Sequence, residues 1–85
     1  MTYEIRWSHH AFRKFEKLDG QVRKRITEKL EGIVDDPFVE AKRISGTNLY
    51  SLRVGDYRVI MSVERGRMLI IVVDLGHRKK IYKNL

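Results

Sequence analysis

The chain has 85 residues, of which 34% are charged, and it carries a formal net charge of +7 with no cysteine. That length suits one small domain with a limited core, and the absence of cysteine excludes disulfides, thiolate chemistry and cysteine-based zinc sites. The N-terminus lacks the pattern of a signal peptide, and the longest apolar run, Met68 to Val73, is too short to span a bilayer. We therefore expect a single domain over residues 1–85, located in the cytoplasm.

The positive charge is concentrated in the second half of the chain. Residues 1–41 hold eight Lys/Arg and eight Asp/Glu, whereas residues 42–85 hold ten Lys/Arg and three Asp/Glu. A one-sided basic surface is typical of nucleic-acid binding. An acidic protein segment would be attracted by the same charge, so both classes of partner stay open.

The first half of the chain predicts a strand followed by two helices. Thr2 to Trp7 alternates apolar and polar residues, as a half-buried strand does. Apolar residues then recur at helical spacing over residues 9–18, after the N-cap candidate Ser8, and again from Gln21 to about Asp35. The short Asp19-Gly20 break predicts an αα-hairpin lying on one face of the sheet.

Two strands are predicted around Gly55-Asp56, a pair that suits a two-residue type II′ turn. Such a turn fixes the register and places Arg53 opposite Arg58 on one face of the hairpin. Like charges directly opposite each other destabilise a sheet, and a polyanion lying across both would relieve the repulsion. A solvated hairpin with scattered surface arginines accounts for the pattern equally well. The other face is expected to hold Leu52, Val54, Tyr57 and Val59.

A last long strand is expected from Met68 to Leu75, and its apolar start is typical of a strand covered on both faces. A two-residue turn at Arg65-Gly66 would place Arg58 opposite Val73, while residues 38–44 are expected to be irregular. The predicted fold is α+β, with an antiparallel sheet of about four strands and the helical hairpin on one face. The element order is β-α-α-β-β-β, and the partner of the first strand is left open.

The sequence gives little support for a metal site or a cofactor. His9 and His10 are adjacent, so on a helix their side chains diverge by about 100°, and His77 stands alone among cations. The three acids of the basic half are not beside one another, and no glycine-rich phosphate loop is present. These patterns argue against metal-dependent, paired-carboxylate and nucleotide-binding enzymes.

What remains is a set of cations with one tyrosine. Arginine can hold a phosphate by two hydrogen bonds and stabilise charge that develops on it, and an aromatic ring can stack on an unpaired base. Such a set can bind a scissile phosphodiester and favour its transition state without a metal. Each residue alone also fits a role in packing or solubility. The candidate catalytic residues are Arg53, Arg58, Arg78 and Tyr82. The candidate RNA-binding residues are Lys42, Arg43, His77, Lys79, Lys80 and Lys83.

Three segments resemble the RelE toxins of the RelE/ParE superfamily: Leu49–Ile60 with Gly-Asp-Tyr-Arg, Val73–Arg78 with Gly-His-Arg, and Ile81-Tyr82. The opening strand, helical hairpin and length fit too, so the resemblance covers essentially the whole chain. It implies the toxin of a type II toxin–antitoxin system, a ribosome-dependent mRNA endonuclease. Such a toxin cleaves the codon in the ribosomal A site with the ribose 2′-OH as nucleophile. It implies no metal and no cofactor.

The resemblance also implies a role for each matching residue. Arg58 matches the arginine that stabilises the transition state, Arg78 the one that grips the phosphate, and Tyr82 the tyrosine that stacks on a base or helps move a proton. Ser51 stands where the best-known member has the first of two lysines, and Arg53 stands where it has the second. Since the first lysine is missing, the general base is left open among Lys79, Lys80 and His77.

Two alternatives come from other classes of protein. The ParE branch of the superfamily poisons DNA gyrase without cleaving RNA, and a non-catalytic basic module would bind nucleic acid without strand scission. A toxin implies a cognate RelB-like antitoxin whose acidic and amphipathic segments fold partly on binding. The complex of the two is expected to bind operator DNA, whereas mRNA and the ribosome are the partners expected of the free toxin; no membrane is involved.

Overall fold

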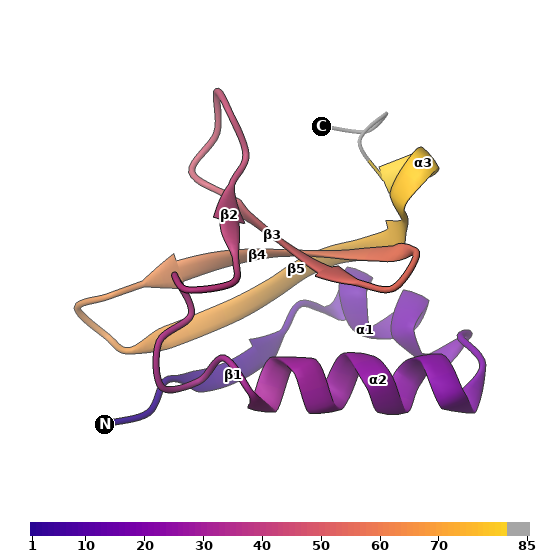
Figure 1. Cartoon of the computed structure of the whole chain (residues 1–85), viewed down its shortest axis with the longest axis horizontal. Coiled ribbons are helices and arrows are strands. Elements are labelled where there is room, and N and C mark those ends of the chain that lie inside the picture. Colours follow the sequence, from indigo (N-terminus) through magenta and orange to yellow (C-terminus); the bar gives the residue numbers. More distant parts are fainter. Residues whose placement is uncertain (82–85) are drawn as a thin grey trace.

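The computed structural model describes residues 1–81, which form one five-stranded sheet and three helices (Figure 1). None of these helices is long and apolar enough to cross a membrane. In chain order the elements are β1 (Glu4–Trp7), α1 (His9–Glu16), α2 (Gly20–Glu31), β2 (Lys42–Arg43), β3 (Tyr50–Val54), β4 (Tyr57–Glu64), β5 (Leu69–His77) and α3 (Arg78–Ile81).

The strand order in the sheet is β1-β5-β4-β3-β2. The predicted α+β class with an N-terminal helical hairpin is confirmed, with two differences in the sheet. β1 pairs with β5 in parallel, whereas the other neighbouring strands are antiparallel. In addition, β2 forms a short strand within the stretch 38–44 that was expected to be irregular. Two residues are too few to show the alternation by which a strand is recognised in a sequence.

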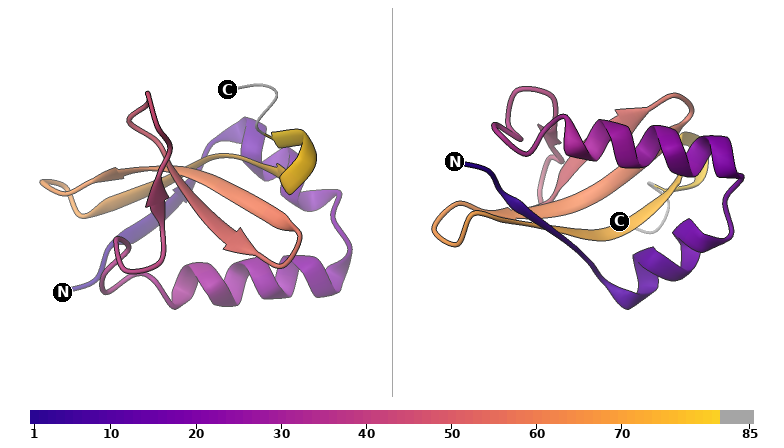
Figure 2. Two further views of the ribbon diagram at one scale, coloured as in Figure 1. Left: turned by 45° about the horizontal axis from the view of Figure 1, so that its top comes forward. Right: turned by 90° about the horizontal axis from the view of Figure 1, so that it is seen from below.

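Both long helices begin at capping side chains. Ser8 Oγ accepts a hydrogen bond of 3.1 Å from the backbone N–H of Ala11, and the Asp19 carboxylate accepts one of 3.0 Å from that of Gln21. These contacts satisfy donors that the first turn of a helix leaves unpaired. Figures 1 and 2 show α1 and α2 on the same side of the sheet, as predicted. α2 ends at Glu31, several residues earlier than expected.

The main core lies between these helices and the sheet. It contains the predicted inward residues of the hairpin, Leu52, Val54 and Val59, together with apolar residues of α2 and β5. Ile60 and Ile81 are also buried, but they lie outside this core cluster. Since α3 contacts β4 and β5, a smaller apolar contact covers part of the opposite face of the sheet. We call that face, which α1 and α2 leave uncovered, the open face.

The β3–β4 hairpin has the predicted register, with Arg53 opposite Arg58. Gly55 has a φ of 58° and Asp56 has no positive φ, which agrees with the expected type II′ turn. A positive φ at the first central position strains most residues, so the glycine determines this turn. The turn therefore sets the two arginines side by side.

The register between β4 and β5 differs from the prediction. Arg58 lies opposite Gly76, whereas a two-residue turn at Arg65-Gly66 would place it opposite Val73. The turn spans residues 65–68 instead, because Glu64 pairs with the first residue of β5, and the ladder shifts register midway along β4. A bulge of this kind and a longer turn leave little trace in local sequence.

Candidate functional site

A basic hollow of about 370 Å³ lies on the open face, over β2, β3 and β4. Figure 1 shows β2 with the loop that follows it on one side of this face and α3 on the other. The structure thus brings two candidate catalytic arginines together with two candidate RNA-binding residues from a separate strand. The hollow is lined by Glu40, Lys42, Arg43, Ile44, Ser51, Arg53 and Arg58.

Arg58 carries an unsatisfied donor in this hollow. Its Nη1 is buried and has no hydrogen-bond partner among the residues that the structure describes. A buried donor left unpaired costs about 1–3 kcal/mol. A guanidinium has five N–H donors in a fixed fork that matches phosphate geometry, so Arg58, which lines the hollow, can hold an anionic oxygen there.

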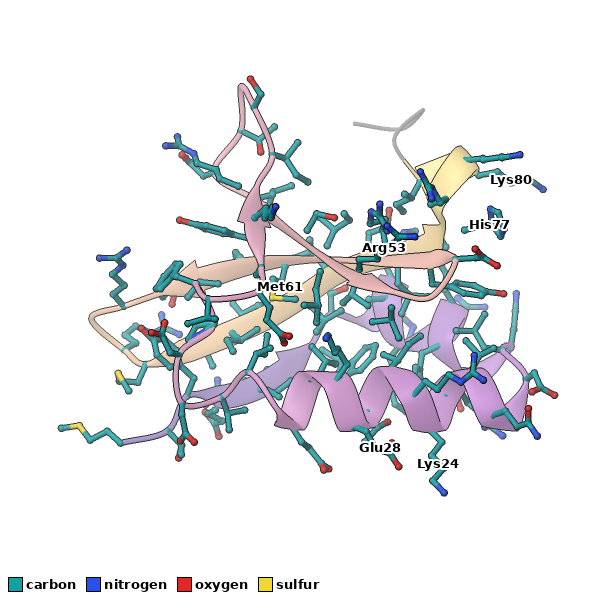
Figure 3. All side chains as sticks on the ribbon, viewed as in Figure 1. Lys24, Glu28, Arg53, Met61, His77 and Lys80 are labelled. Atoms are coloured by element: carbon teal, nitrogen blue, oxygen red, sulfur yellow. The ribbon has the colours of Figure 1, made fainter. Side chains whose placement is uncertain are left out.

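Arg53 stands beside Arg58 and is exposed. Figure 3 shows its side chain on the open face, away from α2. Its Nε donates a long hydrogen bond of 3.4 Å to the backbone oxygen of Gly55. This weak contact leaves the guanidinium available for another acceptor, and no acid lies directly opposite it to offset the repulsion from Arg58.

Glu40 is a residue of the hollow that sequence reasoning missed. Its Oε1 accepts a hydrogen bond of 3.0 Å from Lys29 Nζ of α2. The partner offsets the charge of this acid, so the hollow keeps its positive character.

Ser51, at the position where the resemblance implies a missing lysine, lines the same hollow. Its place in the sheet, opposite Lys42, brings it into the site.

The described cations of the C-terminal tail, His77 at the end of β5 and Arg78, Lys79 and Lys80 in α3, do not line the hollow. The backbone N–H of Arg78 donates a 2.8 Å hydrogen bond to the carbonyl of Asp56. This bond connects α3 to the turn of the β3–β4 hairpin. The ring of His77 packs edge-on against Tyr57 with centroids 5.8 Å apart. Figure 3 shows Lys80 on α3, pointing outward from the molecule.

The candidate set is therefore brought together in part. The tail residues share the end of the sheet where Arg58 pairs with Gly76, but none of the described ones lines the hollow. Those tail residues are His77, Arg78, Lys79 and Lys80. Tyr82 and Lys83 lie outside the described residues, so their roles stay predictions.

A second charged cluster was also missed, at the edge of the open face. Asp74 Oδ1 accepts hydrogen bonds of 2.8 Å from Lys14 Nζ and from the backbone N–H of Leu75, and it lies 3.2 Å from His10 Nε2. Burial by itself raises the pKa of Asp74, but these hydrogen bonds and the charges of Lys14 and His10 outweigh it and lower that pKa. A contact between residues this far apart in the chain has no local sequence signal.

This chain has relatives among known proteins. The family model described as the ParE toxin of the type II toxin–antitoxin system parDE matches residues 5–82. The mRNA interferase toxin RelE of Escherichia coli is 26% identical over 83 residues, which cover 94% of this chain and 87% of that protein.

Solved structures of toxin–antitoxin complexes have the same fold. RelE in the RelE–RelB complex of the archaeon Pyrococcus horikoshii superposes with a TM-score of 0.79 at 26% identity, covering 94% of this chain and 99% of that one. A chain of a RelBE complex from Mycobacterium tuberculosis gives a TM-score of 0.82 at 21% identity, covering 92% and 100%.

Proposed function

We propose that this chain, which belongs to the family of ParE toxins of type II toxin–antitoxin systems and is RelE-like, is an mRNA interferase. It cleaves mRNA in the ribosomal A site and so stops translation. The observation that carries this proposal is the hollow in which Arg53 and Arg58 lie together with two further cations, Lys42 and Arg43. The name of the E. coli relative supports the same activity at 26% identity.

The proposed reaction needs positive charge at one phosphodiester. The ribose 2′-oxygen attacks the phosphorus, the bond from phosphorus to the 5′-oxygen breaks, and the products are a 2′,3′-cyclic phosphate and a 5′-hydroxyl. A base takes the 2′-OH proton, and an acid gives a proton to the leaving 5′-oxygen. Negative charge grows on the non-bridging oxygens, and we assign its stabilisation to the guanidinium of Arg58.

The other cations have supporting roles in this proposal. Arg53 adds charge beside Arg58, and Arg78 grips a neighbouring phosphate from the start of α3. Lys42 and Arg43 bind the RNA backbone at the β2 side of the hollow. Such a set supplies the charge stabilisation that a metal ion provides in other nucleases, so we propose metal-independent cleavage.

The ribosome has a defined task in this proposal. The hollow binds phosphate but presents no described group that would bend a flexible RNA into the in-line geometry of 2′-OH attack. A ribosome that holds the codon in place would supply this orientation, and orientation accounts for a large part of many catalytic rates. We therefore propose that free RNA is cleaved poorly and that the protein acts in the cytoplasm.

The second partner in this proposal is an antitoxin. Solved relatives are complexes of RelE with RelB, and we propose that a RelB-like protein with acidic segments covers the basic open face of this chain. Its negative charge would neutralise the hollow, and its apolar segments would order on binding. The resulting complex is proposed to bind operator DNA.

Primer-extension mapping of mRNA ends after expression tests this function. Cuts in frame with translated codons, and none in the same mRNA when its start codon is removed, are the expected result. The family description favours one other candidate, a ParE-like poison of DNA gyrase. Intact mRNA together with DNA damage that a resistant gyrase abolishes would select that candidate, and RNA binding without either effect would select a non-catalytic module.

A further inference from the structure

A row of positions crosses the open face, one strand at a time. Arg53 of β3 lies opposite Arg58 of β4, and Arg58 lies opposite Gly76 of β5. Directly opposite residues in antiparallel strands project from the same face, with Cβ atoms about 4.5–5.5 Å apart. The row of arginines therefore reaches β5 at a residue that has no side chain.

Lys14 of α1 brings a cation to this position from outside the sheet. A Cβ built on Gly76 would lie 3.8 Å from Lys14 Nζ and 3.4 Å from Ile81 Cδ1. With the cross-strand spacing, this places the ammonium within about 10 Å of the Cβ of Arg58. α1 reaches this place because β1 ends at Trp7, and the helix that follows packs against β5.

Asp74 holds the Lys14 ammonium by a 2.8 Å hydrogen bond. The Asp74 side chain is only 16% exposed and also accepts a hydrogen bond from the backbone N–H of Leu75, so its carboxylate is fixed. An ammonium has three donors, and the Lys14 side chain remains 38% exposed. It is thus oriented by the protein and still accessible to an anion from solution.

We propose that Lys14 binds a phosphate of the RNA backbone next to the phosphate held by Arg58, with Asp74 as its positioning residue. The inference rests on the proposed function, since it assigns a further contact to the same substrate. It extends the row of Arg53 and Arg58 by one strand. Lys14 of α1 thereby adds a cation to the open face, where Ser51 occupies one strand position with an uncharged side chain.

Binding of an uncleavable RNA tests this role without catalysis. The probe is a single-stranded oligoribonucleotide with 2′-O-methyl groups, titrated with the free full-length chain over a range of salt concentrations. Lys14→Ala should weaken binding about tenfold and reduce the slope of log affinity against log salt by about 0.7. Lys14→Arg should keep the slope, because the positive charge remains.

Two further variants separate a binding role from a structural one. Asp74→Asn should weaken binding less than Lys14→Ala and keep the salt slope, since the ammonium is retained but no longer held. Lys24→Ala, on the side of α2 that Figure 3 shows remote from the open face, is the charge-matched control and should leave affinity nearly unchanged. Thermal unfolding of every variant shows whether it is folded.

The proposal is overturned if Lys14→Ala is folded and binds the probe with the wild-type salt slope. It is equally overturned if Lys24→Ala causes the same loss, because the effect would then be one of net charge. Cleavage by the wild type on translating ribosomes is measured separately. If the wild type does not cleave but Lys14→Ala lowers the slope, the proposed function fails while the phosphate contact stands.

Discussion

Arg53 and Arg58 lie directly opposite each other in the β3–β4 ladder, so that two guanidinium groups share one face of a short hairpin. Such a pair opposes folding, because like charges at directly opposite positions repel. The Gly55 turn nevertheless enforces this register. Stability therefore competes at this pair with the phosphate binding that we propose, and the competition can be measured.

Arg53→Gln is expected to stabilise the protein and to weaken cleavage. Removing one charge relieves the repulsion by about 0.2–1 kcal/mol, which corresponds to a rise in Tm of a few degrees for a chain of this size. Thermal unfolding and in-frame mRNA cleavage, measured on the same preparation, check the two effects. A loss of both stability and cleavage would show that Arg53 holds the hairpin together.

Arg58→Ala is expected to lower cleavage about a hundredfold, because one charge-assisted contact to a transition state contributes roughly 3 kcal/mol. The free energy of unfolding should change much less, since the buried Nη1 of Arg58 has no hydrogen-bond partner within residues 1–81. Single-turnover cleavage on programmed ribosomes measures the first effect, and urea unfolding the second.

Two variants sharpen that experiment. Arg58→Lys keeps the charge but loses the fork, and should recover only part of the rate. Lys24→Ala removes a cation from α2, where Figure 3 shows it on the side remote from the open face, and should be active. Growth inhibition that survives Arg58→Ala combined with Arg78→Ala would refute the assignment of both arginines.

Asp74 gives the fold a defined pH dependence. Its pKa is lower in the folded protein than in the unfolded chain, so its contribution to stability is present above about pH 4 and is lost as the pH falls through the lowered pKa. Asp74→Asn should lower the free energy of unfolding by about 1–3 kcal/mol at pH 7. The difference in the free energy of unfolding between wild type and Asp74→Asn should become smaller at acidic pH.

Urea unfolding at a series of pH values measures this difference. Glu4→Gln is the control, because Glu4 pairs with Arg6 at a site where both side chains are 62% exposed, and exposed pairs contribute at most about 1 kcal/mol. A constant difference between wild type and Asp74→Asn from pH 7 to pH 2 would show that the carboxylate charge is unimportant.

Val59→Asp is expected to unfold the protein. Val59 has no exposed surface and belongs to the main core, and a buried carboxylate without a partner costs several kcal/mol. The matched control is Val39→Asp, because Val39 is 75% exposed and surface substitutions usually change stability by less than about 0.5 kcal/mol. Circular dichroism of both variants checks the contrast.

The β3–β4 hairpin, which carries Arg53 and Arg58, could be predicted from sequence because its determinants are local. Gly55 fixes a two-residue turn, and the alternation of side chains then decides which residues face the helices. Capping by Ser8 was predictable for the same reason, since the cap and the donor it satisfies are three residues apart. The Arg53–Arg58 contact follows from these local rules alone.

The rest of the site depends on contacts between distant segments. The place of Gly76 opposite Arg58 follows from a longer turn and a bulge, and an error of even one residue in register changes the face on which a side chain lies. Lys14 meets Asp74 and Glu40 meets Lys29 only after the helices pack on the sheet. Such pairs carry no periodic signal from which they could be inferred.

The parallel pairing of β1 with β5 has a consequence for how the molecule is made. β1 and β5 are joined by contacts that span 65 residues, such as that of Ser8 with Val73, and chain closure over this span is slow. Until β5 has been synthesised, α1 lacks the strand against which it packs. A nascent chain that stops before Leu69 therefore presents the apolar face of α1 to chaperones and proteases, and Arg58 in it lacks the neighbouring strand that carries Gly76.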